Sequence, residues 1–258
     1  MNEGEPRIDF WIRKEIKEQR GLAVKTLKRE KEGGRVGWAV YDSPVKFYDN
    51  LFELPDGYKK ILDYLDGEYK EKLGDLVGIE LGGPGSQLFK DLNESKRRFI
   101  KSVGVALADA RYDNAKQSDK LINHEVIEAN VFSTGFTGDG DIEYSGFEKV
   151  EDWVDKNGHA DLILEMMHLP IHRFKAHSEL FFNSVLRWYR LLSEKGTLLV
   201  QGPKFATNFL DEIKVELKKV GIQFDYRVTS DELSYISIRK LEGSPDNLDN
   251  VLRNLRLS

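Results

Sequence analysis

The sequence contains no cysteine among its 258 residues. This absence excludes a disulfide-stabilised fold, a cysteine-ligated zinc or iron–sulfur site, and catalysis by a thiolate. Any metal site would have to be built from histidine and carboxylate ligands.

Long hydrophobic runs are also absent. No apolar segment approaches the roughly 18–20 residues that a membrane-spanning helix needs, and the charged residues that follow Met1 lack a signal-peptide core. We therefore expect a cytoplasmic protein with no membrane partner. The formal net charge of −5 argues against a wide nucleic-acid-binding surface, because such surfaces are usually basic.

The composition that is present is globular, with 40% hydrophobic residues and 32% charged residues of mixed sign. The length favours one large domain or two small ones, because single cores stop growing at roughly 250–300 residues.

Charge is distributed unevenly along the chain. The first 35 residues contain ten Lys and Arg against seven Asp and Glu, a charge of +3, so the remainder of the −5 chain carries −8. Apolar residues recur among these charges at helical spacing, which predicts an amphipathic helix ending near Gly33 and Gly34. Two interpretations stay open: a solvated helical face, or an arm that binds RNA or phosphate through basic residues clustered on one side.

The segment from residue 36 to residue 69 is rich in aromatic side chains. Tyrosine and tryptophan combine an apolar body with one hydrogen-bonding group, so they suit either core packing or the wall of a small-molecule site. The aromatic residues are Trp38, Tyr41, Phe47, Tyr48, Phe52, Tyr58, Tyr64 and Tyr69.

A regular alternation of apolar runs and longer helical segments begins after Lys72. This alternation predicts β-α-β units and a parallel sheet covered on both faces. The apolar runs lie at residues 76–81, 103–107, 125–130, 162–166 and 197–200.

The last third of the chain predicts two helices and a hairpin. The clearest helix spans residues 178–194 and is expected to end at Lys195-Gly196, and a second lies near 208–220. The runs 222–228 and 234–239 alternate and lie too close together for a helical crossover, so they should form an antiparallel hairpin at the sheet edge. A short helix is possible around 248–255.

The most informative segment is VGIELGGPGSQLF at residues 77–89. It is a buried strand that reaches the acid Glu80, then a glycine-rich turn, then a helix expected from Ser86. Glycines allow the backbone to turn sharply and to approach a ligand closely, and a carboxylate at a strand end can bind a ligand amine. In a parallel sheet, ligands bind beyond the carboxyl ends of the strands.

Two common nucleotide motifs do not fit this segment. The dinucleotide fingerprint G-x-G-x-x-G, started at Gly83, places the bulky Leu88 where a small third residue should pack helix against strand. No G-x-x-x-x-G-K-[ST] motif occurs anywhere, which argues against a P-loop nucleotide hydrolase.

The segment IELGGPG at residues 79–85 resembles the first motif of the class I S-adenosylmethionine-dependent methyltransferases. The resemblance extends from about Gly74 to Lys240 and includes the terminal helix-strand-turn-strand arrangement. It implies an α/β three-layer sandwich with a seven-stranded, mostly parallel sheet, an antiparallel last strand and an N-terminal helical extension. We accordingly predict an N-terminal extension or cap at residues 1–72 and an S-adenosylmethionine-binding methyltransferase domain at residues 73–258.

The resemblance also implies the residues that would bind the methionine end of the cofactor. Glu80 would face its amino group, and the backbone of Gly82, Gly83 and Gly85 would lie along it.

The sequence matches the family less closely at the positions that would bind the adenosine end of the cofactor. Family members usually have an acid at the end of the second strand for the ribose hydroxyls, but Ala106 occupies that place and the nearest acid is Asp109. Asn130, followed by Val131, stands where the family often has an acid that faces the adenine amino group, and its side-chain carbonyl can accept the same hydrogen bond.

The segment DLILEMMH at residues 161–168 resembles the fourth motif of the family, and residues 192–200 resemble the helix end and fifth strand that follow it. Methyl transfer needs an aligned nucleophile and, where that nucleophile carries a proton, a general base. Glu165 and His168 are the candidate bases, with His168 preferred because histidine titrates near neutrality.

Other roles for these residues stay open. His168 could be a structural polar residue, and Glu165, His168, His172 and His177 could ligate a metal, although their spacing matches no known motif and we expect none. The N/D-P-P-Y/F signature of many amino-group methylations is absent, which favours oxygen, carbon or small-amine acceptors.

These features together predict S-adenosylmethionine-dependent methyl transfer to an acceptor, with a small molecule favoured over a nucleic acid bound through the basic N-terminal residues. The alternatives are a catalytically inactive binding protein on the same fold and an NAD(P)-dependent oxidoreductase.

Overall fold

The computed structural model describes residues 44–49, 51–72, 74–94, 98–106, 120–129, 131, 146–165, 178–229, 233–248 and 251. The basic segment 1–35 and most of the possible helix at 248–255 lie outside these ranges. No helix within the described ranges is both long and apolar enough to cross a membrane.

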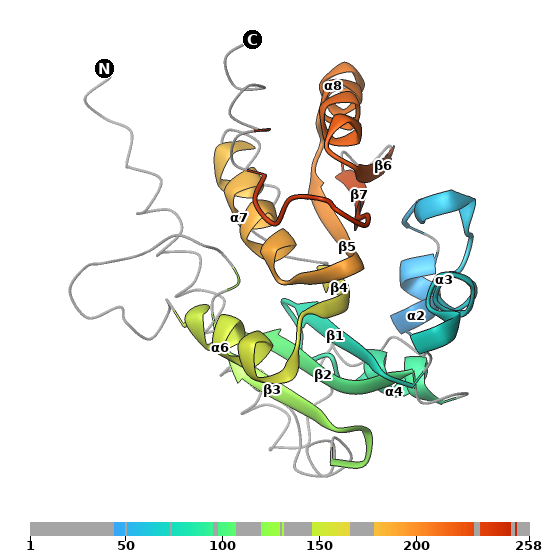
Figure 1. Ribbon diagram of the computed structural model, residues 1–258, viewed down its shortest axis with the longest axis vertical. Helices are drawn as coiled ribbons and strands as arrows, with labels where there is room; N and C mark the ends of the chain where they lie inside the picture. The colour runs from blue at the N-terminus through green and yellow to red at the C-terminus, as the bar shows by residue number, and fades with distance from the viewer. Residues whose placement is uncertain are drawn as a thin grey trace, which may run out of the picture.

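A single seven-stranded sheet, in the order β3-β2-β1-β4-β5-β7-β6, forms the centre of the molecule (Figure 1). Strands β1 to β5 are parallel to one another, whereas β7 pairs antiparallel with both β5 and β6. The mostly parallel sheet and the antiparallel terminal hairpin predicted from the sequence are therefore confirmed. The strands are β1 Leu76–Leu81, β2 Phe99–Ala106, β3 His124–Glu128, β4 Ala160–Glu165, β5 Leu192–Pro203, β6 Ile222–Val228 and β7 Leu233–Lys240.

Helices cover both faces of this sheet, which confirms the three-layer sandwich (Figure 1). One face packs against α2, α3 and α4, and the other against α6, α7 and α8. The helices are α2 Pro44–Asp49, α3 Ile61–Glu68, α4 Ser86–Asn93, α6 Glu148–Asn157, α7 Ser178–Arg190 and α8 Thr207–Lys219, and the 3-10 turns are η1 Pro55–Gly57, η2 Lys70–Lys72 and η3 Lys120–Ile122.

Strand β1 illustrates why the apolar runs become buried strands. Its side chains alternate between the two faces, with Leu76 in the core under α2–α4 and Val77 and Ile79 in the core under α6–α8. Because both faces are covered, both sets must be apolar, and the strand appears in the sequence as a continuous hydrophobic run.

The predicted end of the helix before β5 is wrong. We expected it at Lys195-Gly196, but α7 ends at Arg190 and β5 begins at Leu192. Gly196 lies inside β5, where a Cβ atom would be 2.6 Å from the carbonyl oxygen of Ala160. The glycine is therefore required by close approach of two strands and not by a helix C-cap.

The described part of the N-terminal segment packs on the same sheet. Phe52, Tyr64 and Tyr69 are buried in the core that α2, α3 and α4 form with the strands, so these aromatic residues serve packing. The boundary between residues 72 and 73 stays a prediction.

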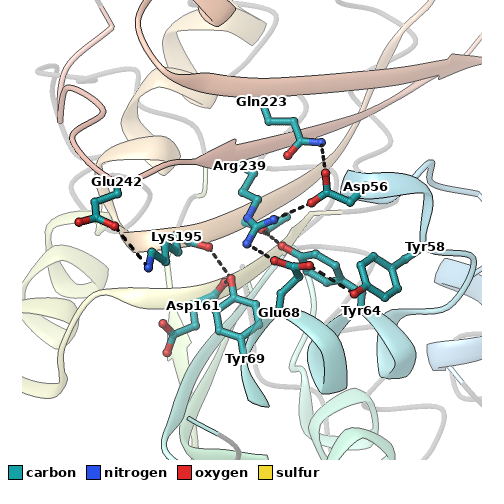
Figure 2. Close-up of polar contacts among 11 residues, drawn as sticks. Asp56, Tyr58, Tyr64, Glu68, Tyr69, Asp161, Lys195, Gln223, Arg239 and Glu242 are labelled. Carbon is teal, nitrogen blue, oxygen red and sulfur yellow. Dashed lines mark hydrogen bonds and ion pairs between the residues drawn. The ribbon is translucent and has the colours of Figure 1, made fainter. Parts of the chain in front are cut away.

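Polar contacts attach this segment to the end of the sheet where the parallel strands begin, which we call the amino end (Figure 2). Arg239 of β7 is only 7% exposed and donates hydrogen bonds to Asp56, at 2.9 Å, and to Glu68. Its guanidinium also lies over the ring of Tyr64, 5.8 Å from the centroid, and the Tyr64 hydroxyl is hydrogen-bonded to Thr197.

A second contact in the same region ties Tyr69 to the start of two strands (Figure 2). Its hydroxyl donates to the carbonyl oxygens of Asp161, at 2.9 Å, and Lys195, at 2.7 Å. The Asp161 carboxylate in turn accepts from the backbone N–H of Val77 at 3.0 Å and pairs with Lys72. Residues 56–72 are thus joined to β1, β4, β5 and β7.

Candidate functional site

The glycine-rich turn connects β1 to α4 at the opposite end of the sheet, the carboxyl end. Gly82 has φ 96° and Gly85, directly before α4, has φ 68°, both in the left-handed region that side chains disfavour. The Gly82 N–H donates to the carbonyl oxygen of Val105 at 2.7 Å, which ties the turn to β2. The helix predicted to begin at Ser86 does begin there.

The turn lies directly against β2 at Gly104. A Cβ atom on Gly104 would be 2.0 Å from the carbonyl oxygen of Pro84 and 2.8 Å from that of Gly83, so no other residue fits. Gly104 was not predicted as a site residue. A glycine inside a buried apolar strand was the available signal, because it often marks close approach of another backbone.

Glu80 lies half-buried beneath the same turn. Its carboxylate accepts a hydrogen bond from the hydroxyl of Tyr48 at 3.0 Å and another from the backbone N–H of Gly85. A Cβ atom on Gly83 would be 2.6 Å from Oε2 of Glu80, so the turn passes directly over the carboxylate.

The electrostatic setting of Glu80 is unusual for a carboxylate. Burial raises the pKa of Glu80 above its ordinary value, and the hydrogen bonds from Tyr48 and Gly85 oppose that shift. Both of these donors are neutral, and within the described ranges Glu80 forms no ion pair with lysine or arginine. The arrangement therefore suits a cationic ligand group.

His124 also contacts the turn. Its Nε2 lies 2.6 Å from the carbonyl oxygen of Pro84, and its Nδ1 lies 2.8 Å from the hydroxyl of Ser102 on β2. Because a carbonyl oxygen only accepts, Nε2 must carry the hydrogen of this bond. Its ring also packs against Phe89 of α4, 5.6 Å between centroids. The histidine thus fixes the turn relative to β2, β3 and α4.

His124 was not predicted as a site residue, and Tyr48 was predicted only as one of eight aromatic residues that suit core packing or the wall of a small-molecule site. Tyr48 lies 32 residues from Glu80, and His124 lies 40 residues from Pro84. No local spacing pattern connects residues so far apart, and the packing of α2 and β3 alone brings them to the turn.

The predicted adenosine-binding residues lie only partly within the described ranges. Strand β2 ends at Ala106, as expected, and Asp109 and Asn130 lie outside the described residues. Val131 is buried in the core on the α6–α8 face, and its carbonyl oxygen accepts the indole N–H of Trp188 at 2.8 Å.

Glu165 is the last residue of β4 and is fully buried. Its Oε2 accepts a hydrogen bond from the backbone N–H of Gln201 at 3.2 Å, and burial raises its pKa well above the ordinary value. Glu165 pairs in register with Leu81, one position beyond Glu80, so the pleat places the two acids on opposite faces of the sheet. The other candidate base, His168, lies outside the described residues.

The alternative metal site also involves residues beyond those described, because His172 and His177 lie there together with His168. Among the described residues, no group of three or more histidine and acidic side chains is arranged to bind a metal ion.

Comparison with known proteins gives similarity at the level of solved structures. No protein-family model matches the sequence, and no curated protein matches it. An rRNA methylase from Streptococcus thermophilus is 12% identical over 70% of this chain and 94% of that one, with a TM-score of 0.42. An O-methyltransferase family protein from Burkholderia thailandensis is 11% identical over 71% of this chain and 56% of that one, with a TM-score of 0.41.

At these low scores, the fold rests on the strand order and direction of this chain itself. A seven-stranded sheet in the order β3-β2-β1-β4-β5-β7-β6, with β7 antiparallel and a glycine-rich turn directly after β1, has the features that the sequence resemblance implied. The chain therefore has the fold of the class I S-adenosylmethionine-dependent methyltransferases.

Proposed function

We propose that this chain binds S-adenosylmethionine at the carboxyl end of β1 and catalyses transfer of its methyl group. The carboxylate of Glu80 is the observation that carries this proposal. It is half-buried beneath the glycine-rich turn, and among the described residues its hydrogen-bond donors, Tyr48 and Gly85, are neutral, so it is suited to receive the ammonium group of a bound amino acid.

The groups at the turn fit the methionine end of the cofactor. Glu80 would bind the ammonium group, and the backbone at Gly82, Gly83 and Gly85 leaves no side chain between the ligand and the turn. The left-handed conformations of Gly82 and Gly85 explain why the turn needs glycine at these positions.

The adenosine end would use a different combination of groups. Ala106 at the end of β2 offers no side-chain acceptor, so we propose Asp109 for the ribose hydroxyls. We propose that Asn130 binds the adenine amino group and that the backbone at Val131, next to it, lines the same part of the site.

When bound, S-adenosylmethionine supplies an activated methyl group. The contribution of the chain is then to orient the acceptor, exclude water and remove a proton where the acceptor carries one. We propose His168 for the proton removal. Glu165 is the second candidate, and its buried carboxyl group at the end of β4 would hold a proton to higher pH than an exposed glutamate does.

The acceptor that we propose is a small molecule, because the chain beyond residue 35 carries a net charge of −8. Methylation of RNA by the full chain, lost together with its salt dependence when residues 1–35 are deleted, would replace this acceptor assignment with a nucleic acid.

Dinucleotide oxidoreduction is disfavoured by the helix that follows the turn. Leu88, at the third position of the dinucleotide fingerprint, is 1% exposed and packs in the α2–α4 core, where that fingerprint needs a small residue. A greater thermal stabilisation by NAD than by S-adenosylmethionine would support the oxidoreductase instead.

Calorimetric titration of the full chain with S-adenosylhomocysteine tests the proposal. We expect binding by the wild type and a loss of roughly tenfold to a hundredfold in affinity on Glu80→Gln, because an amide provides no charge for the ammonium group. Glu53→Gln, a matched change at an exposed glutamate, should bind as the wild type does. Absence of binding by the folded wild type would overturn the proposal.

Binding without methylation of any acceptor in a broad extract screen would identify the chain as an inactive binding protein on this fold. The cofactor site would then stand and the methyl-transfer step would not.

A further inference from the structure

We infer that Tyr48 is a positioning residue of the cofactor site. Its hydroxyl fixes the carboxylate of Glu80 in the orientation and charge state that receive the cofactor's ammonium group. The inference rests on the proposed function and deepens it, because it makes the segment before the sheet part of the site.

The ring of Tyr48 is held in place by packing. Tyr48 is 5% exposed and stacks on Phe52, with 6.2 Å between ring centroids and 21° between ring planes. Phe52 in turn packs edge-on against Tyr235 of β7 at 5.5 Å. The hydroxyl that reaches Glu80 at 3.0 Å is therefore presented by a rigid aromatic cluster.

The helix that carries Tyr48 is also fixed at its end. Asp49, the last residue of α2, accepts a hydrogen bond from the backbone N–H of Ile61 at the start of α3, at 2.7 Å. Helix α3 is joined through Glu68 to Arg239 at the amino end of the sheet (Figure 2). The start of α3 thus holds the end of the helix that carries Tyr48.

Within the part of the chain that the structure describes, Tyr48 is one of two groups that favour the charged form of Glu80. From α2 it contacts Tyr48, and from the turn it contacts the N–H of Gly85. Its register neighbours, Gly104 of β2 and Leu164 of β4, carry no charge. The nearby acid Glu165 lies one register position further and on the opposite face of the sheet.

Tyr48→Phe removes this hydroxyl and keeps the ring. With one fewer donor opposing the effect of burial, the pKa of Glu80 should rise. Affinity for S-adenosylhomocysteine at neutral pH should fall by roughly tenfold, and the pH below which binding is lost should move upward.

Tyr58→Phe is a matched control from the same segment. The Tyr58 hydroxyl also donates to a glutamate, Glu68, at 3.3 Å, but at the amino end of the sheet. This variant removes the same group from the same residue type and should change neither the affinity nor the pH dependence of binding.

The experiment is calorimetric titration with S-adenosylhomocysteine from pH 5 to pH 9. It compares the wild type, Tyr48→Phe, Tyr58→Phe, Glu80→Gln and the double variant Tyr48→Phe/Glu80→Gln. If Tyr48 acts through Glu80, the loss caused by Tyr48→Phe should disappear in the Glu80→Gln background.

A second readout needs no ligand. In the ligand-free chain, a higher pKa of Glu80 in the folded state means that Tyr48→Phe should lose stability relative to the wild type as pH rises above about 4.5, the ordinary value for glutamate. Denaturant titration at several pH values measures this difference and also shows whether the variant folds.

The inference is overturned if Tyr48→Phe and the wild type give the same pH profile of binding, or if Tyr48→Phe weakens binding equally with and without Glu80. Failure of the proposed function gives a different result, because the folded wild type itself would then bind no S-adenosylhomocysteine. That result would overturn both the proposed function and the role of Tyr48.

Discussion

Partly buried carboxylates occur at both ends of the sheet, but their partners differ. At the amino end, the partly buried Glu68 and the exposed Asp56 contact the guanidinium of Arg239 (Figure 2), and the buried Asp161 carboxylate contacts Lys72. At the carboxyl end, the described contacts of Glu80 are with the neutral hydroxyl of Tyr48 and the backbone N–H of Gly85.

We interpret this difference as one between a structural role at the amino end and the binding role that we propose at the carboxyl end. Acids that are paired with a cation are costly to leave unpaired and have little capacity left for a ligand. An acid held by neutral donors in a partly buried place has a raised pKa and attracts a cation, which is typical of binding and catalytic sites. Polar residues at the two ends of one sheet should therefore respond differently to mutation.

The largest effect on stability is expected at the amino end. Arg239→Met should lower the free energy of unfolding by about 2–4 kcal/mol, because it removes a buried guanidinium and leaves the partly buried Glu68 without its cation. Denaturant titration measures this loss, and the remaining folded protein should bind S-adenosylhomocysteine with nearly unchanged affinity.

Lys195→Met provides the control for Arg239→Met. Lys195 forms an exposed ion pair with Glu242 at 3.5 Å in the same region, and removal of such a pair should have no measurable effect on stability (Figure 2). A large loss of affinity in Arg239→Met at full folding would contradict the separation of the two ends.

A smaller effect on stability, with a larger effect on binding, is expected at the carboxyl end. Gly104→Ala places a methyl group 2.0 Å from the backbone of Pro84, so the turn must move away from β2. We expect a loss of about 1–3 kcal/mol in the free energy of unfolding. Affinity for S-adenosylhomocysteine should fall more in Gly104→Ala than in Arg239→Met, although Arg239→Met is the more destabilising change.

Gly146→Ala is the matched control for Gly104→Ala. A Cβ atom at Gly146 would have its nearest neighbours at 3.5 Å, an ordinary contact, so stability should change little. Wild-type binding by Gly104→Ala would show that the position of the turn on β2 is unimportant to the site.

The smallest expected effect concerns Glu165, and its sign depends on pH. Because the folded-state pKa of Glu165 lies well above 4.5, the folded chain retains this proton where the unfolded chain has released it, and stability falls as pH rises above about 4.5. Glu165→Gln keeps an acceptor for the N–H of Gln201 and has no proton to release. It should match the wild type below pH 4.5 and become more stable by about 1 kcal/mol toward neutral pH.

Denaturant titrations of Glu165→Gln between pH 4 and pH 8 measure this difference. Glu53→Gln at the surface serves as the control for loss of one negative charge. A Glu165→Gln variant that is less stable than the wild type at neutral pH would mean that Glu165 is ionised there and paired with a cation, as the acids at the amino end are.

The fold was largely predictable because its signals are local. The apolar runs at 76–81 and 222–228 coincide with β1 and β6, since strands buried on both faces must be apolar throughout. The short connection between β6 and β7 required an antiparallel pair. The helix end predicted at Lys195-Gly196 was wrong because glycine occurs both at helix ends and where two strands approach closely. Gly196 is needed for the close approach of β4 to β5, and α7 ends earlier, at Arg190.

The site was predictable only in part, for the same reason. Glu80 and the glycines of the turn are consecutive in the chain, so their chemistry is visible in the sequence. Tyr48, Gly104 and His124 reach the turn from α2, β2 and β3, and no spacing rule connects these elements to it.

The sequence by itself determined the order of strands and helices, the burial of the sheet on both faces and the glycine-rich turn after an acid, because periodicity and backbone conformation depend on neighbouring residues. Only the tertiary structure decided which partners those groups have. It brought the Tyr48 hydroxyl to Glu80 and the Arg239 guanidinium to Asp56, residues 32 and 183 positions apart, and long-range packing of this kind leaves no trace in local spacing.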